Sequence, residues 1–409
     1  MNRNLYDRVY RYLETLPVVS THEHHLEDDD QAGLTLERVF ERSYVGWQGL
    51  SWGTGRAGRR DFLDRARYNS YFVWLQKALE ELYGFGGRIT ADNWEELSAA
   101  ISRRHREDRD LHLKILKERC RYRAGLADIY WDPGSDLGHP DLFRPVVRSD
   151  VFITCFHPGV RDHDDNSPWL FFPQVEGLGF DEYVDFVLDF HRRGVDEKGA
   201  VAFKLATAYE RPIAVGDPSY EQAARVYLRD PGEVSDREKH AYGDYLIHRV
   251  CELAVELGVP YQVHTGLGQL GGSNPMNLEP LISRHPELRF VLFHGGYPWC
   301  SQVGALAHNH PNVLVDLVWL PLISTSAATR SLHEYLEVVP SSDRIAWGSD
   351  TWTSEEALGA LLAFQHVLAR VLAEKIEDGY LGMQDAEDVA RKLMHRNAEG
   401  IYGLEGRSG

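Results

Sequence analysis

Eight short apolar runs divide this chain of 409 residues, and most of them are followed by a stretch with helical periodicity. Alternating strands and helices imply right-handed crossovers and a parallel sheet, and eight such units suggest a closed barrel. Several runs are almost continuously apolar, as expected of strands covered on both faces. The sequence therefore predicts an α/β fold, a (β/α)8 TIM barrel. Its strands are expected within residues 18–25, 123–131, 151–156, 201–206, 260–266, 289–296, 313–319 and 344–350.

A long helical insertion is expected after the first strand, over about residues 34–120. Phe72, Leu75, Leu79 and Leu82 recur there at three- and four-residue steps, which is a helical period. The competing architecture, an open doubly wound sheet, is disfavoured because no Gly-x-Gly-x-x-Gly turn follows a strand. We interpret residues 1–409 as a single barrel domain that carries this insertion.

Charge and composition argue against several classes of function. The chain has 44 Lys and Arg against 62 Asp and Glu, a net charge of -18, whereas nucleic-acid binding needs a basic face. No apolar run reaches the roughly 18 residues of a membrane span. The four cysteines form no Cys-x-x-Cys pair, which favours reduced thiols and a cytoplasmic protein. We expect a small-molecule substrate and neither a nucleic-acid nor a membrane partner; a homo-oligomer stays open.

Ionisable side chains stand where apolar runs give way to loops. His22 and His24 are two residues apart at the end of the first run, so their imidazoles should point the same way. The others are Lys204, His264, His294 and Asp350. In a TIM barrel the strands end at the active-site face, and burying so many ionisable groups together is costly unless a cation pairs them. The pattern therefore predicts a divalent metal site.

Four motifs carry a resemblance to a known family. They are Val263-His264-Thr265-Gly266, Phe293-His294-Gly295-Gly296-Tyr297-Pro298, Trp347-Gly348-Ser349-Asp350 and Asn397-Ala398-Glu399-Gly400-Ile401-Tyr402. Together with the His-x-His pair and Lys204, the set resembles the amidohydrolase superfamily of metal-dependent (β/α)8 hydrolases. The likeness is to its amidohydrolase-related branch, and the helical insertion resembles that of uronate isomerases.

The resemblance implies a role for each matching residue. His22 and His24 would be the paired ligands of a buried metal, and Asp350 would contact the metal and take the proton of its bound water. His264 would be a third ligand of one metal, or His264 and His294 together would hold a second one. Lys204 would bridge two metals if carboxylated; otherwise it would bind a substrate carboxylate or form a salt bridge. Zinc is the expected ion, with manganese or iron as alternatives, as one ion or two.

This ligand set predicts hydrolysis of a small-molecule amide, lactam or lactone. A metal lowers the pKa of its bound water toward about 7, and Asp350 would act first as general base and then as general acid. His294 would help to polarise the scissile carbonyl. A uronate-isomerase-like isomerisation of a sugar acid, a non-oxidative decarboxylation and a non-catalytic metal-binding protein are the alternatives.

Further residues are candidates for substrate binding. His157 and Trp131 stand at expected strand ends, and Tyr297, Trp319 and Trp352 would form an aromatic wall. The glycine-rich segment 46–60 carries Arg56 and is either a mobile surface loop or a lid whose arginine meets an anionic substrate group. Glu23 should face away from its two neighbouring histidines in a structural role. A second His-x-His pair, His308 and His310, precedes a strand and is interpreted as surface.

Overall fold

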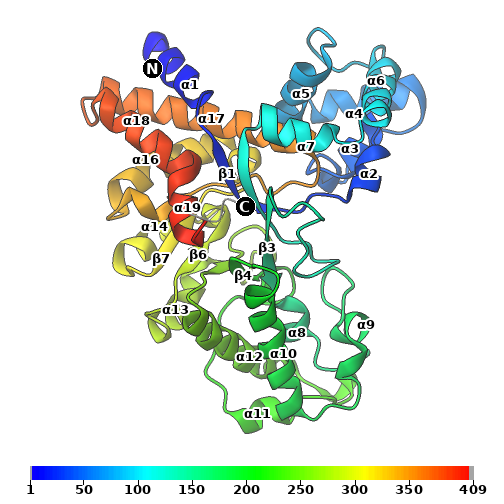
Figure 1. Cartoon of the computed structure of the whole chain (residues 1–409), viewed down its shortest axis with the longest axis vertical. Coiled ribbons are helices and arrows are strands. Elements are labelled where there is room, and N and C mark those ends of the chain that lie inside the picture. The colour runs from blue at the N-terminus through cyan, green and yellow to red at the C-terminus, as the bar shows by residue number, and fades with distance from the viewer. Residues whose placement is uncertain (1, 405–409) are drawn as a thin grey trace. The chain divides into compact units, whose positions relative to one another are not determined.

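The computed structural model describes residues 2–404 and confirms the predicted α/β barrel. Eight parallel strands form one sheet in the order in which they occur along the chain (Figure 1). Their bounds are β1 Val18–Glu23, β2 Tyr122–Ala127, β3 Phe143–Arg148, β4 Ala202–Leu205, β5 Tyr261–Val263, β6 Phe290–Leu292, β7 Val313–Asp316 and β8 Ile345–Ala346. Phe203 of β4 pairs with Tyr261 of β5, which pairs with Phe290 of β6, and all three side chains are buried.

One predicted strand is wrong. Residues 151–156 lie largely in a short helix, α8 (Asp150–Thr154), and the third strand is instead the upstream segment β3. A short apolar run does not by periodicity alone distinguish a strand from a buried helix turn. The true strand reads Phe-Arg-Pro-Val-Val-Arg, and its two arginines and proline interrupt the apolar signal.

The chain divides into two compact units. Unit 1 comprises Met1–Gly125, Val318–His333 and Trp347–Arg396, and unit 2 comprises Leu126–Leu317, Glu334–Ala346 and Asn397–Gly409. The interpretation of residues 1–409 as a single domain stays a prediction.

Unit 1 is built around α17 (Ser354–Glu377), which packs against α1 (Arg3–Leu13) and α5 (Ser70–Tyr83) (Figure 1). Gly359 permits the close approach of α17 to α5, because a Cβ there would stand 2.9 Å from the carbonyl oxygen of Trp74. In sequence α17 is apolar enough to cross a membrane, but 83% of its most apolar window is buried within the structure, as in the core helix of a soluble protein.

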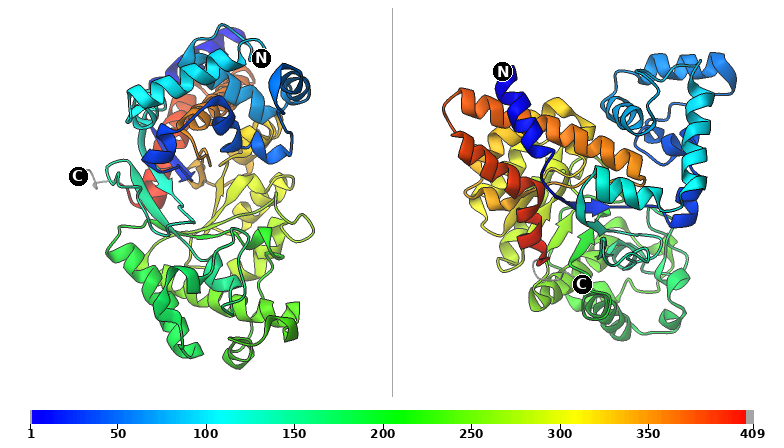
Figure 2. Two further views of the ribbon diagram at one scale, coloured as in Figure 1. Left: turned by 90° about the vertical axis from the view of Figure 1, so that its right-hand side faces the viewer. Right: turned by 45° about the horizontal axis from the view of Figure 1, so that its top comes forward.

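The predicted helical insertion is present in unit 1, drawn in shades of blue and cyan in Figure 2. Its own core includes Phe40, Phe62, Phe72 and Trp94, and the rings of Phe40 and Phe62 contact each other and both of the other two rings. Besides α5, its α-helices are α3 Leu36–Glu41, α4 Gly55–Ala66, α6 Trp94–Glu107 and α7 Leu111–Lys114, and the short helix α2 (Asp28–Ala32) precedes it.

In unit 2 the two longest helices, α10 (Phe180–Asp196) and α12 (Asp236–Leu257), pack against each other. Gly194 lets α10 approach β3, since a Cβ there would stand 2.6 Å from a methyl carbon of Val147. A Ser235–Glu238 capping box begins α12, and Gly258, in the left-handed conformation, ends it. Further α-helices of unit 2 are α9 Pro168–Phe171, α11 Tyr220–Ala224, α13 Glu279–Arg284, α14 Cys300–Asn309 and α19 Asn397–Tyr402.

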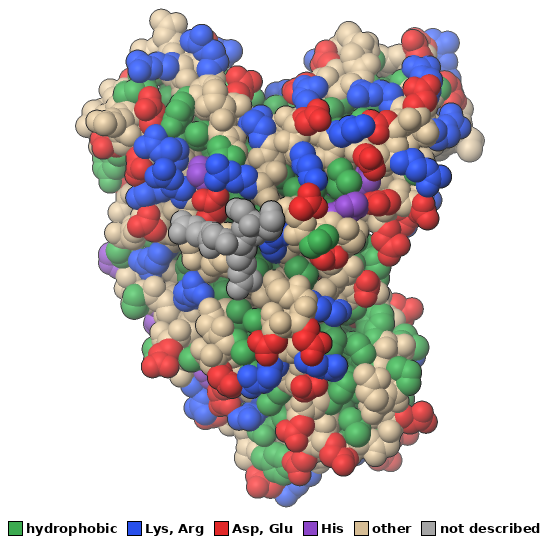
Figure 3. All heavy atoms as spheres, in the orientation of Figure 1, with side chains coloured by type: hydrophobic (Ala, Val, Ile, Leu, Met, Phe, Trp, Pro, Cys, Tyr) green, Lys and Arg blue, Asp and Glu red, His purple; other side chains and the backbone are tan. Residues whose placement is uncertain are grey.

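The surface and the thiols agree with the composition. On the face drawn in Figure 3, basic and acidic side chains are interspersed. Cys120, Cys155, Cys251 and Cys300 are all free thiols.

Candidate metal centre

Three predicted ligands come together in unit 1. His22 lies near the end of β1 and His24 just beyond it, and Asp350 follows β8. Backbone pairing fixes these segments, because the N–H of Asp350 donates to the carbonyl of His22 at 2.9 Å and that of His24 donates to the carbonyl of Thr351 at 3.0 Å. The Asp350 Oδ1 atom then lies 3.2 Å from His24 Nε2 and 3.9 Å from His22 Nε2.

The triad of His22, His24 and Asp350 fits a divalent cation. Each side chain offers one ligand atom, and the three atoms lie within 4.8 Å of one another. Ligand bonds of about 2.0–2.2 Å in a tetrahedral zinc site place ligand atoms about 3.3 Å apart, so only small adjustments are needed. The residues are 1%, 6% and 3% exposed, respectively. Two imidazoles and a carboxylate form a three-residue donor set of the kind that catalytic zinc sites use, whereas structural zinc sites use four protein ligands.

Glu23 holds the segment that carries Asp350. Its buried carboxylate accepts hydrogen bonds from the hydroxyls of Ser349 at 2.6 Å and Thr351 at 3.2 Å, the residues on either side of Asp350. Tyr122 of β2 donates a further one at 2.8 Å. The expectation that Glu23 has a structural role agrees with these contacts.

Contacts with His25 and Ser349 favour the ionised form of Glu23. Burial raises the pKa of Glu23, but the charge of His25 and hydrogen bonds from His25 and Ser349 outweigh it and hold the pKa below its ordinary value. His25 Nε2 lies 3.3 Å from the carboxylate.

The backbone around Asp350 is unusual. Asp350 has φ 64° and Trp319 has φ 62°, a left-handed conformation that few non-glycine residues adopt. Gly348 allows the close approach of this segment to β1, because a Cβ there would stand 2.6 Å from Thr21 Oγ1 and 2.8 Å from the backbone nitrogen of His22.

Two more predicted ligands meet in unit 2. His294 Nε2 lies 2.9 Å from His264 Nδ1, and the two buried rings have centroids 4.3 Å apart. His294 has φ 63°, so a left-handed residue follows β6 as well. The Lys204 ammonium is buried in β4 and lies 3.7 Å from the centroid of the Phe293 ring, a cation–π contact. Roles for these three residues as ligands stay predictions.

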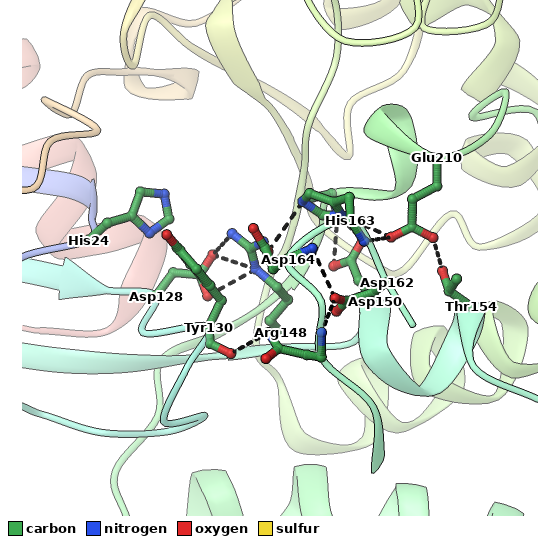
Figure 4. Close-up of polar contacts among 12 residues, drawn as sticks. His24, Asp128, Tyr130, Arg148, Asp150, Thr154, Asp162, His163, Asp164 and Glu210 are labelled. Carbon is green, nitrogen blue, oxygen red and sulfur yellow. Dashed lines mark hydrogen bonds and ion pairs between the residues drawn. The ribbon is translucent and has the colours of Figure 1, made fainter. Parts of the chain in front are cut away.

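Sequence reasoning missed a polar network in unit 2 (Figure 4). The guanidinium of Arg148, which ends β3, donates to Asp128 at 2.6 Å and to Asp164 at 2.9 Å. His163 lies between Asp164, at 3.3 Å, and Glu210, at 2.8 Å, and Glu210 accepts a hydrogen bond from the hydroxyl of Thr154. Asp128 and Arg148 each stand at the end of a strand, the position that identified the other candidates. Because the third strand was predicted at residues 151–156, Arg148 was not recognised as a residue at the end of a strand.

Burial and neighbouring charges shift the pKa values of the groups in and beside this network. Burial lowers the pKa of Arg148, but the charges of Asp128 and Asp164 outweigh it and raise the pKa well above its ordinary value. Burial raises the pKa of Asp150 to about 7, and the carboxylate of Asp150 accepts the N–H of Ala206 at 2.8 Å. Burial likewise raises the pKa of Asp162 to about 6.

An aromatic side chain connects the network with the histidine pair. The ring of Tyr209 lies 4.8 Å from that of His163 and 4.5 Å from that of His264, measured between centroids. Tyr209 belongs to the one-turn helix Thr207–Tyr209 that follows β4. Neither Tyr209 nor His163 carries a sequence signal that separates it from ordinary loop residues.

The predicted substrate-binding residues have different surroundings. Trp319 and Trp352 are buried in unit 1, and Trp352 stacks on His24. Arg56 belongs to α4, where its side chain is 65% exposed and pairs with Asp92. The remaining three are half-buried in unit 2: Trp131, which contacts Tyr130, His157, whose Nδ1 accepts the N–H of Gly159, and Tyr297. Their roles in binding stay predictions.

His308 is exposed and His310 half-buried, in agreement with their interpretation as a surface pair.

Comparisons with known proteins agree with this fold. The family model described as amidohydrolase matches residues 174–404, more than half of the chain. Protein fluG of Emericella nidulans is 30% identical over 228 residues, 51% of this chain but only 26% of that protein, so the match spans about a quarter of its length.

Two solved structures share the fold over almost their whole length. A uronate isomerase of Thermotoga maritima has a TM-score of 0.76 at 17% identity and covers 98% of both chains. A Lactobacillus casei protein assigned as a metal-dependent hydrolase has a TM-score of 0.71 at 16% identity, covering 97% of this chain and 98% of its own.

Proposed function

The chain belongs to the amidohydrolase family, and on that premise we propose that it is a metal-dependent hydrolase of a small-molecule amide, lactam or lactone. One observation carries the proposal: His22, His24 and Asp350 place three ligand atoms within 4.8 Å of one another in a buried site. A buried carboxylate beside two imidazoles is costly without a cation to pair it.

The triad would hold a single divalent ion, for which zinc is our first choice and manganese or iron the alternatives. When bound, such an ion supplies Lewis acidity and makes hydroxide available near neutral pH. Binding of the ion by His22 and His24 requires neutral imidazoles, so metal affinity should fall in acid. The proposal has an extension with two alternatives. Either His264 would bind the same ion as a third imidazole, or His264, His294 and Lys204 would hold a second ion.

Asp350 would act as the proton carrier. Its carboxylate would accept the proton of the attacking water and pass it to the leaving nitrogen or oxygen, first as general base and then as general acid. Glu23 supports this role, because its bonds to Ser349 and Thr351 fix the backbone on both sides of Asp350. His294 would donate a hydrogen bond to the carbonyl under attack.

Isomerisation of a sugar acid and non-oxidative decarboxylation use the same kind of triad, and one experiment separates the three reactions. Metal-loaded protein is screened against N-acyl compounds, lactones and uronates in 18O-labelled water. Hydrolysis incorporates one labelled oxygen into the product, isomerisation changes the reducing group without incorporation, and decarboxylation releases CO2. Turnover of uronates alone without label uptake, or CO2 release alone, would overturn the hydrolase proposal.

We further propose that the enzyme acts in the cytoplasm on small molecules, without a nucleic-acid or membrane partner. The net charge of -18 and the burial of the most apolar helix support this. Nuclease-treated lysate fractions would test it, since the protein should stay in the soluble fraction.

A further inference from the structure

Five aromatic side chains in unit 1 form a continuous cluster, which we call the aromatic cluster. Trp319 stacks on Tyr44 with centroids 4.5 Å apart, and on Tyr71 at 6.2 Å with planes 6° apart. Trp47 contacts Trp319 at 6.4 Å and Trp352 at 5.3 Å. These offset and edge contacts are the arrangements that aromatic rings prefer. The members are Tyr44, Trp47, Tyr71, Trp319 and Trp352.

The aromatic cluster adjoins the metal triad. The ring of Trp352 stacks on that of His24, with centroids 5.4 Å and planes 26° apart. Trp352 follows Asp350 by two residues, and its carbonyl accepts the N–H of Leu26 at 3.0 Å, which ties it to the segment that carries His24. The series of ring contacts therefore runs from Trp47 through Trp352 to His24 of the triad.

One member of the cluster is exposed. Tyr44, Trp319 and Trp352 are 2%, 4% and 7% exposed, whereas Trp47 is 55% exposed. Leaving a large apolar ring in water is unfavourable, and here the ring is fixed by contacts with two other tryptophans rather than free at a loop tip.

The backbone gives a second, independent sign of function. Trp319 is held at φ 62° and ψ -29°, which is strained for so bulky a residue. Strain of this kind persists where the surroundings enforce it and gathers at ligand sites. The N–H of Tyr44 donates to buried Glu356 at 2.8 Å, which anchors a residue two positions before the turn Gly46–Gln48 that carries Trp47.

We propose that Trp47 is a specificity-determining residue that stacks on a planar aromatic group of the substrate, so that the substrate is an amide, lactam or lactone bearing an aromatic ring. This rests on the proposed function, because Trp47 is connected with His24 of the triad through the ring of Trp352. Trp47 is 55% exposed, so an added aromatic ring continues the series of stacked and edge contacts there.

The test uses metal-loaded, full-length protein and measures binding as well as turnover. The probes are benzoate, acetate and glucuronate by calorimetry, and N-benzoyl against N-acetyl derivatives of one amine by kinetics. The variants are Trp47→Ala and Trp47→Phe, with Tyr68→Ala as the matched control, since Tyr68 is an 81% exposed aromatic residue in the same insertion.

We expect Trp47→Ala to weaken benzoate binding by about tenfold, to leave acetate unchanged, and to raise KM for the benzoyl substrate with little change in kcat. Trp47→Phe should retain most of the preference, and Tyr68→Ala all of it. Equal effects on benzoate and acetate, no preference in the unaltered protein, or a loss confined to glucuronate would overturn the proposal. Loss of benzoate preference in Trp47→Ala without hydrolysis of any substrate would leave the aromatic site standing and refute the hydrolase function alone.

Discussion

Ser349 donates a hydrogen bond from its hydroxyl to the buried carboxylate of Glu23, 2.6 Å away. Glu23 separates His22 from His24 along β1, and Ser349 precedes Asp350, so this bond joins the two segments that bear the metal triad. The side chains of His22 and His24 face one side of the strand and Glu23 the other. The strand thus presents the two imidazole ligands on one face. From the opposite face, Glu23 holds in place the segment that carries Asp350, the third ligand.

Glu23→Gln should therefore weaken metal binding. The variant removes a charge that accepts bonds on both sides of Asp350, and loss of such an outer contact typically costs about 10–100-fold in metal affinity. Zinc affinity by competition with a chelator checks this, with exposed Glu96→Gln as the control. Unchanged zinc affinity in Glu23→Gln would show that Asp350 holds its position without this contact.

Gly348→Ala should destabilise the protein by about 1–3 kcal/mol, because the added Cβ overpacks the contact with β1. The clash is with Thr21 Oγ1 at 2.6 Å and with the backbone of His22, which cannot move without shifting the triad. Denaturant unfolding measures the change in the free energy of unfolding. Gly271→Ala is the matched control, since a Cβ there meets no atom within 4 Å and should leave stability nearly unchanged. Equal stability of the two variants would contradict the packing argument.

Glu355 should contribute stability that disappears in acid. Burial raises its pKa, but hydrogen bonds from His105 and Tyr83 and the charge of His105 outweigh it and lower the pKa from 4.5 to about 2. Because the folded pKa lies below the unfolded one, the contribution is complete above about pH 4.5 and is lost as the pH falls toward 2.

At pH 7, Glu355→Gln should lower the free energy of unfolding by about 3 kcal/mol, since it breaks a buried pair. Unfolding free energies of both proteins between pH 7 and pH 3 check this. The difference between them should shrink as the pH falls, and a constant difference would assign the loss to packing instead of charge.

Much of the fold and half of the site were predictable because they follow local rules. His22 and His24 share a face by strand alternation, and Asp350 follows an apolar run, so the triad needed only the barrel as context. Arg148 was missed because Pro145 and two arginines interrupt the apolar pattern of β3, whereas the continuous apolar residues 151–153 have the pattern of a buried strand. The bond between Ser349 and Glu23, 326 positions apart, and the exposure of Trp47 depend on tertiary packing, which periodicity does not encode.

The central claim is that His22, His24 and Asp350 bind a divalent ion, and the metal content of a double variant tests it most directly. The chain supplies its own control in a second His-x-His pair, His308 and His310, which lies in unit 2 outside the triad. Protein purified after zinc loading and dialysis is analysed by mass spectrometry for metal per chain. We predict that His22→Ala with His24→Ala loses at least one ion per chain, whereas His308→Ala with His310→Ala keeps the full content. Retention of all metal by the first variant would contradict the account.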